Sequence, residues 1–423
     1  MASNIKRVQS FLAEIFNKRD LKALKRQLTS TTSEIPAEHI SSGKSAEHLQ
    51  HRLQQIQINP EYKSQFADDW SVNNATKFDR NIENYIGTCR VPLGLAGPVR
   101  VNGLFAKGDY LLPLATTEAA LVASYSRGCK AITLSGGCTS MLTNLGVSRS
   151  PGFIFNTLVE AGEFVAWATN QFETFAKVVS TTTRYGSLID VKFTMEGNHV
   201  YIIFDYATGD ASGQNMVTIA TQAIVNYIVE NSPVMAKHYY VEANLSGDKK
   251  ASQQSFQSVR GKKVISEVNI PKEIFETVFH TTPKAMADYW RISCIGGVLS
   301  STIGCQGHYA NGLAALYIAT GQDAACVSES SIGLTRMEET DNGDLYASVT
   351  LPNIMVGTIG GGTGLPTQNA CLEMMGLSGL NKANALAEVC GALCLGGELS
   401  IMAALTNGDF TKAHQSMARK SAN

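Results

Sequence analysis

The sequence has no excess of charge of either sign and no long apolar run. Its 35 Lys and Arg residues balance 36 Asp and Glu residues, so nothing indicates nucleic acid or an anionic membrane as the main partner. No run of about 18 residues is free of charges and helix breakers, which predicts that no segment spans a bilayer. The amphipathic start MASNIKRVQSFLAEIFNKRD is too charged for a secretory signal. We therefore expect a soluble, cytoplasmic protein.

The cysteine pattern also lacks the usual signatures of a metal site or a disulfide framework. Nine cysteines are scattered along the chain without a C-x-x-C pair. Most lie in apolar or small-residue runs, as do Cys294, Cys305, Cys390 and Cys394. This pattern predicts reduced thiols in the core of a cytosolic protein. No Cys/His spacing supports zinc, so we expect no metal.

What the chain does have is the composition of a globular protein of two or three domains, with 423 residues, 44% of them hydrophobic. Residues 1–78 are polar with a helical pattern and a Ser/Thr-rich break, which predicts an N-terminal helical segment that packs on the body or on a partner subunit. Residues 79–152 read as loops and short strands, then a helix capped by Thr116 or Thr117 with Glu118 in its first turn.

Residues 153–240 show a helix over about 157–178, a strand pair over 187–206, a turn, a second helix and a last strand. This order predicts a small split α+β domain. Residues 241–423 mix Ala/Gly-rich helices with a β segment near 345–364. We expect an α+β fold, in which a large mixed helical and β domain (79–152 and 241–423) carries an inserted small ferredoxin-like α+β domain.

Two glycine-containing turns could hold an anion. GDASGQNM (209–216) follows a strand-like run and precedes a helix-like run, although the G-x-G-x-x-G fingerprint is absent. GTIGGGTGLP (357–366) is the second such turn. Glycines let backbone N–H groups approach a phosphate, and the alternative for the second turn is a tight β-corner.

Several polar residues stand in apolar or small-residue surroundings: Glu118, Lys249, Lys250, Asp323 and His414, with His308 and Asn311 in the helix before Asp323. Each has a plainer interpretation by itself. An early-helix Glu is often a dipole partner, a Lys pair usually lies on a solvated face, and a C-terminal His is usually a surface residue.

Taken together, these motifs resemble a known family. The blocks ENYIGTCRVPLGLAGPVRVNG, PLATTEAALVAS, GDASGQNM, GDKKAS, GHYANGLAALYIATGQDAA, LPNIMVGTIGGGTGLPTQ, GELSIMAAL and KAH occur in the order found in 3-hydroxy-3-methylglutaryl-CoA (HMG-CoA) reductases. The resemblance covers about residues 80–420 and is stronger to the eukaryotic and archaeal class than to the divergent bacterial one.

The resemblance implies a four-electron reduction of a thioester to an alcohol by two molecules of NAD(P)H, which gives mevalonate for isoprenoid biosynthesis. Lys249 matches the lysine that stabilises charge at the carbonyl oxygen. Glu118 matches the proton donor of the aldehyde step. Asp323 matches the aspartate that holds Lys249 and Glu118 in one network, and His414 matches the acid, on a mobile flap, that protonates the CoA thiolate.

The resemblance also implies binding residues and partners. The cofactor-binding set is Arg184, Asp210, Ala211, Ser212, Gly213, Gln214, Asn215, Gly360, Gly361 and Gly362. The set that binds HMG-CoA is Ser124, Arg127, Lys130, Asn244, Asp248, Lys250, Arg291, His308 and Asn311. An arginine at 184 suits a 2′-phosphate, which favours NADPH over NADH. The resemblance places the active site between two subunits of a homodimer or homotetramer.

The sequence departs from the family at several positions. GFIF follows SRSP where an arginine usually helps to bind substrate, and Glu242 replaces a small serine. Arg291 stands for a lysine, and Ser212 and Gln214 replace the methionines of D-A-M-G-M-N. A lost cation and a gained anion leave open a reductase of a different acyl-CoA. A non-catalytic CoA or nucleotide sensor is the third hypothesis, motivated by the changed cofactor turn alone.

Overall fold

The structure is a computed structural model that describes residues 5, 13–16, 18, 20–29, 40–258 and 260–408. The chain forms two compact units, Met1–Gly87 and Thr88–Asn423. His414, the expected acid for the CoA thiolate, lies outside the described residues.

The first unit is helical, as its polar, periodic sequence predicts. Its helices are α2 (Leu21–Leu28), α3 (Ala46–Gln55), α4 (Pro60–Lys63), α5 (Asp69–Asn73) and the 3₁₀ turn η1 (Ala75–Phe78). The Ser45 hydroxyl caps α3 by accepting from the His48 N–H. Arg52 of α3 is 4% exposed, and its guanidinium donates to the carbonyl oxygens of Tyr85, Ser41 and Gly43. A buried cation thus ties the helix to flanking loops.

The second unit is built on a large mixed sheet. Its strands are β1 (Leu93–Gly103), β2 (Lys107–Ala115), β3 (Cys138–Arg149), β4 (Gly152–Ile154), β5 (Ser187–Glu196), β6 (His199–Ala207), β7 (His238–Tyr240), β8 (Gly261–Ile270), β9 (Gly304–Cys305), β10 (Gly333–Glu339) and β11 (Leu345–Ile354). The hydrogen-bonded order is β7-β4-β6-β3-β8-β11-β10-β9, with β1 also on β3, β2 on β1 and β5 on β6.

The helices of this unit are α6 (Leu121–Leu134), α7 (Leu158–Ala168), α8 (Phe172–Thr182), α9 (Gln214–Asn231), α10 (Gln253–Gln257), α11 (Lys272–Ile274), α12 (Pro283–Leu299), α13 (Tyr309–Thr320), α14 (Val327–Ser330), α15 (Pro366–Met374) and α16 (Ala383–Thr406). Short irregular turns complete it: η2 (Phe275–Phe279), η3 (Ala324–Cys326) and η4 (Gly361–Gly364).

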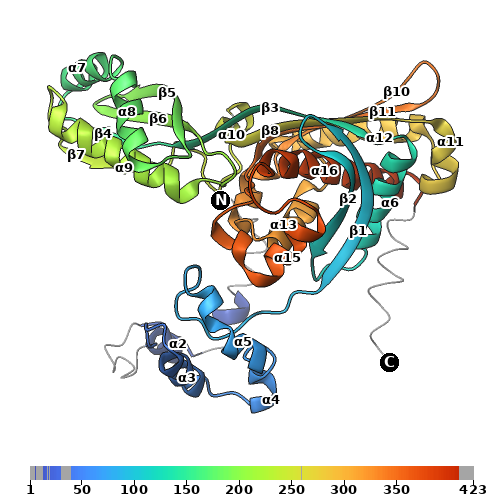
Figure 1. Cartoon of the computed structure of the whole chain (residues 1–423), viewed down its shortest axis with the longest axis horizontal. Coiled ribbons are helices and arrows are strands. Elements are labelled where there is room, and N and C mark those ends of the chain that lie inside the picture. The colour runs from blue at the N-terminus through green and yellow to red at the C-terminus, as the bar shows by residue number, and fades with distance from the viewer. Residues whose placement is uncertain are drawn as a thin grey trace. The chain divides into compact units, whose positions relative to one another are not determined.

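Strand β3 joins two parts of the sheet. Its residues 139–146 pair antiparallel with β8, and residues 147–149 pair with β6. Figure 1 shows β3 running from the body into the lobe that carries β4–β7 and α7–α9. The expected strand pair is present as β5 and β6, in antiparallel register from Ser187↔Ala207 to Glu196↔His199. The single helix expected over about 157–178 is instead two helices, α7 and α8.

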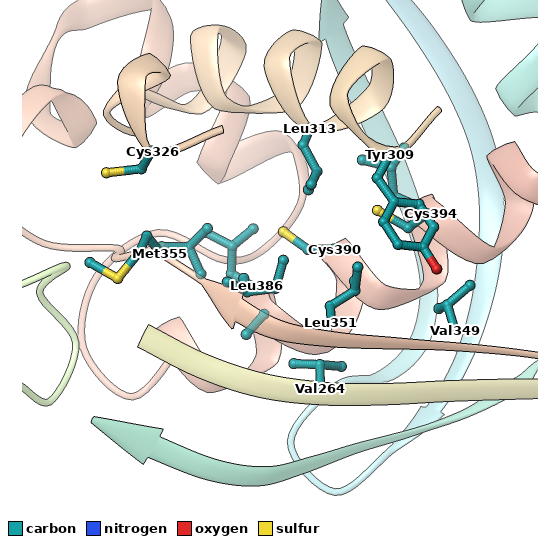
Figure 2. Close-up of a cluster of buried hydrophobic side chains, with 14 of the residues drawn as sticks. Val264, Tyr309, Leu313, Cys326, Val349, Leu351, Met355, Leu386, Cys390 and Cys394 are labelled. Carbon is teal, nitrogen blue, oxygen red and sulfur yellow. The ribbon is translucent and has the colours of Figure 1, made fainter. Parts of the chain in front are cut away.

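Helix α16 is the centre of the core. All but a few of its residues are buried, and it packs against β8, β11, α6 and α13. Figure 2 shows side chains of α13, α16, β8 and β11 meeting in one cluster, with Leu313, Leu386, Cys390 and Val264 among them. Its glycines and alanines permit this close packing: Gly391 has Ser266 and Val264 against the position of a Cβ.

The same helix bears on the membrane prediction. Within the described part of the chain, α16 is the one helix long and apolar enough to cross a bilayer, and 83% of its apolar window is buried in the protein. A buried core helix of a globular protein can have the same length and apolar composition as a membrane-spanning helix.

The expectation that all cysteines are reduced thiols is wrong for one pair. Cys294 of α12 and Cys305 of β9 form a disulfide with their Cα atoms 5.5 Å apart. The other seven cysteines are free, and six of them are buried. The sequence did not indicate the pair, because the two cysteines lie 11 positions apart without a disulfide signature, and only the packing of α12 beside β9 brings the two residues together.

Candidate active site

Lys249 and Asp323 form an ion pair, as the family resemblance implied. The Lys249 ammonium lies 2.9 Å from the Asp323 carboxylate, and both side chains are about two-fifths exposed. The hydrogen bond to Asp323 raises the pKa of Lys249 above its ordinary value. Lys249 has a positive φ of 55°, a backbone conformation that non-glycine residues adopt at a cost and that is common at functional sites.

The chain after α13 places Asp323. Gly321 ends α13 in the left-handed conformation at φ 73°, where glycine carries no steric penalty. The Gln322 amide then makes two 2.9 Å hydrogen bonds with the backbone of Gly357. Asp323 caps η3 by accepting from the Ala325 N–H at 3.0 Å. The aspartate is therefore held on a short, fixed turn beside the glycine-rich segment.

Glu118 lies before α6 rather than in its first turn. Thr116 does not cap the helix, because its hydroxyl accepts from the Glu118 N–H in a local turn, and α6 begins at Leu121. The Glu118 carboxylate accepts from the side-chain amide of Asn311, at 2.8 and 3.1 Å. The predicted helix start was wrong because a Thr side chain can satisfy a turn as well as a helix cap.

Glu118, Asn311 and His308 line a cavity of about 450 Å³, which residues of α12 and α16 help to enclose. The remaining lining residues are Tyr289, Ser293, Gln306, Gly307, Ile401, Met402 and Leu405. Its size suits a small organic ligand or part of a larger one. The cavity combines a carboxylate, an imidazole and an amide with apolar walls.

A fully buried carboxylate fixes one wall of this cavity. Glu398 accepts from the backbone N–H groups of Gly307 (2.7 Å) and His308 (2.9 Å), and from the Thr335 hydroxyl (2.7 Å). His308 Nδ1 lies 3.2 Å from the same carboxylate. The ring of His308 also stacks on Tyr125. Glu398 thus orients His308 from α16, a role that its sequence block did not reveal.

Glu118 and Lys249 do not meet within one chain. Asn311 lies near the start of α13 and Asp323 just after its end, so the 12-residue helix separates the two contacts by about 18 Å. Within a single copy Asp323 therefore reaches Lys249 but not Glu118, and the expected network of all three stays a prediction for a site between two subunits. One copy therefore holds two separate groups, Lys249 with Asp323 and Glu118 with Asn311, which are called half-sites below.

The GDASGQNM turn connects β6 to α9 and lies against the second glycine segment. Gly357 has no room for a side chain, because a Cβ there would meet the Ser212 N–H and the Asp210 carbonyl. The Thr358 N–H donates to the Asp210 carbonyl at 2.8 Å. Helix α9 begins at Gln214 with no side-chain cap, which leaves N–H groups of its first turn for an anion.

The Asp210 side chain of this turn also contacts the start of α16. Its carboxylate accepts from the N–H groups of Asn381 (2.7 Å), Lys382 (3.1 Å) and Ala383 (3.2 Å). It therefore caps α16, where the helix dipole favours a negative charge.

The other expected cofactor residues lie around this turn. Arg184 and Asn215 are exposed, Ala211 and Ser212 are half-buried, and Gly213 is buried at the α9 N-cap. Gly360 and Gly361 are exposed with positive φ values of 76° and 55°, and Gly362 packs on Gly321.

Two buried arginines surround Asp248, next to Lys249. Arg260, 1% exposed, lies 2.7 Å from one Asp248 oxygen, and Arg149 lies 3.0 Å from the other. Burial opposes ionisation of Asp248, but Arg260 and Arg149 outweigh it and lower the pKa of that carboxyl. Arg149 lies in the SRSP stretch and Arg260 in no motif, and nothing in the sequence indicated that both side chains flank Asp248.

Glu242 is paired, which answers the concern that it adds a free negative charge. Its carboxylate lies 3.3 Å from Arg149 and accepts from the N–H groups of Ser150 and Asn244. Asn244 takes a positive φ of 66°. Through these contacts Glu242 stabilises the loop that leads to Lys249.

The expected substrate residues of α6 and α12 are spread over the surface of the second unit. Ser124 and Arg127 contact Ser400 of α16, with the Arg127 guanidinium 2.7 Å from the Ser400 carbonyl. Lys130 is exposed. Arg291 is exposed on α12 and pairs with Asp288. Lys250 donates to the Asp248 carbonyl at 2.9 Å.

No group of three or more His, Cys, Asp and Glu side chains that could hold a metal occurs in the part of the chain that the structure describes.

Comparison with known proteins shows where this fold and these motifs recur. Residues 48–419 match the family model of hydroxymethylglutaryl-coenzyme A reductase. The chain is 42% identical over 356 residues to the 3-hydroxy-3-methylglutaryl-coenzyme A reductase of Methanocaldococcus jannaschii, covering 83% of this chain and 88% of that protein. It is 40% identical over 344 residues to that of Haloferax volcanii, covering 80% of this chain and 85% of the relative.

The fold has a solved counterpart. The class II 3-hydroxy-3-methylglutaryl-CoA reductase from Streptococcus pneumoniae, solved bound to NADPH in open conformations, superposes with a TM-score of 0.64 at 20% identity, covering 85% of this chain and 96% of that one. At that identity the likeness supports the fold alone. The mixed α/β fold with a large sheet is that of a CoA-thioester reductase. The chain belongs to the hydroxymethylglutaryl-coenzyme A reductase family.

Proposed function

We propose that this protein reduces HMG-CoA to mevalonate with NADPH, in the mevalonate pathway. The balanced reaction consumes HMG-CoA, two NADPH and two protons, and releases mevalonate, two NADP⁺ and CoA. The observation that carries the proposal is the Lys249–Asp323 pair at 2.9 Å, seated beside two glycine-containing turns that lie against each other. Family membership supports it independently.

The turns fit a dinucleotide. The first turn of α9 is uncapped, and the charge of Asp210 is engaged by α16, so it does not repel a phosphate there. Arg184 is exposed in the turn before β5 and is the group we propose for a 2′-phosphate. Residues 210–215 and 360–362 form the rest of the proposed site, and NADPH supplies the hydrides when bound.

The proposed chemical roles follow from charge. Lys249 stays protonated because Asp323 raises its pKa, so it can donate to the thioester oxygen as negative charge develops there. Glu118 is the proposed proton donor, oriented by Asn311. His414 is the proposed acid for the CoA thiolate and lies outside the described residues.

The separation of the half-sites leads us to propose that two copies build each active site. Helix α12 presents apolar side chains to solvent beside the Glu118 cavity: Ile292, Ile295, Val298 and Leu299 are 61–82% exposed. A stripe of this kind is characteristic of an interface. In the proposed homo-oligomer, Lys249 and Asp323 of one copy approach Glu118, His308 and Asn311 of its partner.

The test is NADPH oxidation with HMG-CoA, together with detection of mevalonate. Lys249→Ala should lower kcat by at least about 100-fold. Lys177→Ala, an exposed lysine of α8, is the matched control and should match the wild type. A wild type that binds NADPH and turns over another acyl-CoA but not HMG-CoA would contradict the substrate. The pairing of Glu242 with Arg149 removes one reason for that alternative.

A further inference from the structure

Gln214, the first residue of α9, places its side-chain amide in a polar cluster with Arg149, Arg260 and Cys326. Its amide oxygen accepts from Arg260 at 2.8 Å and from Arg149 at 3.4 Å. Its amide nitrogen donates to the Cys326 sulfur at 3.2 Å. One side chain therefore uses both its acceptor and its donor.

The first connection leads to Lys249. Arg260 uses the same nitrogen, Nη2, for Gln214 and for an Asp248 oxygen at 2.7 Å. Arg149 likewise contacts both Gln214 and Asp248. Because Asp248 immediately precedes Lys249, the position of the Gln214 amide is tied to the loop that carries the lysine.

The second connection leads to Asp323. Cys326 ends the η3 turn that Asp323 caps. Burial raises the pKa of the Cys326 thiol to about 12, so it remains a neutral sulfur that accepts from an amide. Gln214 is thus linked to both segments that carry the Lys249–Asp323 pair. It contacts Cys326 of the Asp323 turn directly, and it reaches Asp248 through the arginines.

The charges of the cluster disfavour a carboxylate at position 214. Two guanidiniums, Arg149 and Arg260, pair with three carboxylates, those of Glu242, Asp248 and Glu329. A fourth carboxylate would add an uncompensated buried charge. A thioether of the same length could neither donate to Cys326 nor accept strongly from the arginines.

We propose that Gln214 is a positioning residue that aligns the Lys249–Asp323 pair with the cofactor-binding turn. The inference rests on the proposed roles of that pair and of residues 209–216. Gln214 acts through Asp248 and Cys326 and touches no reacting atom. It makes the geometry of the catalytic lysine depend on the position of the turn that holds the cofactor.

The test compares Gln214→Met, which keeps the length and removes both hydrogen-bonding functions, with Gln222→Met. Gln222 is exposed on the same helix and contacts only Asn226 among the described residues, so its replacement should leave kcat unchanged. Gln214→Met should lower kcat about 10-fold, with the dissociation constant for NADPH changed less than about threefold, the size of effect that losing one or two such hydrogen bonds gives. The alkaline limb of the kcat profile should move to lower pH, because a loosened Asp323 no longer holds the Lys249 proton.

A double-mutant cycle with Cys326→Ala identifies the route. The loss from Cys326→Ala should be smaller in the Gln214→Met background than in the wild type, since one contact is removed by both changes. Additive losses, or a Gln214→Met enzyme with unchanged kcat and pH profile, would overturn the role of Gln214 and leave the proposed function standing. A wild type that does not reduce HMG-CoA would overturn both.

Discussion

Asn311 and Asp323 lie at opposite ends of helix α13. Each binds a charged side chain that has a role in the proposed reaction. Asn311 binds the Glu118 carboxylate and Asp323 binds the Lys249 ammonium. A helix is rigid over this length, so no small rearrangement of one chain brings the two groups together. In the proposed homo-oligomer a second copy would supply the missing group without any change in the fold.

Mixing inactive variants tests this arrangement. We expect co-expressed Glu118→Gln and Lys249→Ala chains to recover about a quarter of wild-type activity, because half of the dimers are mixed and each mixed dimer has one intact site. Lys249→Ala mixed with Asp323→Ala is the matched control and should stay inactive, since both lesions fall in the same half-site. The absence of recovery in the first mixture would show that each copy works alone.

Asp323→Asn should shift the pH dependence of kcat. The Asp323 hydrogen bond raises the pKa of Lys249, so its removal lowers that pKa and the lysine loses its proton at a lower pH. The alkaline limb of the profile therefore moves down. Asp109→Asn, which breaks an exposed pair with Arg100, should leave the profile unchanged. An unmoved limb in Asp323→Asn would mean that Lys249 does not set it.

Arg184→Ala should weaken NADPH selectively. Loss of a charge-assisted contact to the 2′-phosphate is expected to raise KM for NADPH about 10-fold or more, with KM for NADH nearly unchanged. Steady-state kinetics with both cofactors give the comparison. An equal rise for both cofactors would place Arg184 elsewhere than at the 2′-phosphate.

Lys262 should leave a signature in the pH dependence of stability. This β8 residue is 5% exposed, donates to the Val356 carbonyl, and has a pKa lowered by burial to about 8. The unfolded chain binds its proton up to a pKa near 10.5, so the folded state gains stability as the pH rises from about 8 towards 10.5.

The gain is about 3 kcal/mol, from 1.36 kcal/mol for each unit of pKa difference. Lys262→Met should abolish this part of the rise, measured as the difference between the two proteins in denaturant unfolding at several pH values. Parallel curves for wild type and variant would contradict the buried, shifted lysine.

Thiol counting tests the disulfide. The unfolded, unreduced protein should show seven thiols, and reduction should raise the count to the nine of the sequence. Replacing Cys294 and Cys305 by Ala should lower the free energy of unfolding by about 3 kcal/mol, the effect of closing a loop of this size. Cys89→Ala, an exposed free cysteine, is the control. Nine thiols before reduction would rule the disulfide out.

Local periodicity predicted the strand pair β5–β6, the glycine motif predicted the turn at 209–216, and the family resemblance implied the pairing of Lys249 with Asp323. The sequence did not predict partners that only packing supplies. Glu242 looked like an unpaired anion because its cation, Arg149, comes from a distant strand. The start of α6 was misplaced because Thr116 serves a turn. Cys294 and Cys305 were misjudged because neither their spacing nor their neighbours shows that α12 lies beside β9.

Helix α16 has a consequence for how the two half-sites of a copy relate. At the first end of α16, Asp210 of the 209–216 turn accepts a hydrogen bond from the Ala383 N–H. Near the last turn of α16, Ile401, Met402 and Leu405 line the Glu118 cavity. At 24 residues the helix is a rod about 36 Å long. In the proposed oligomer the two ends of α16 belong to different active sites. The length of the helix therefore sets the distance between the proposed cofactor-binding turn of one site and the Glu118 cavity of the next.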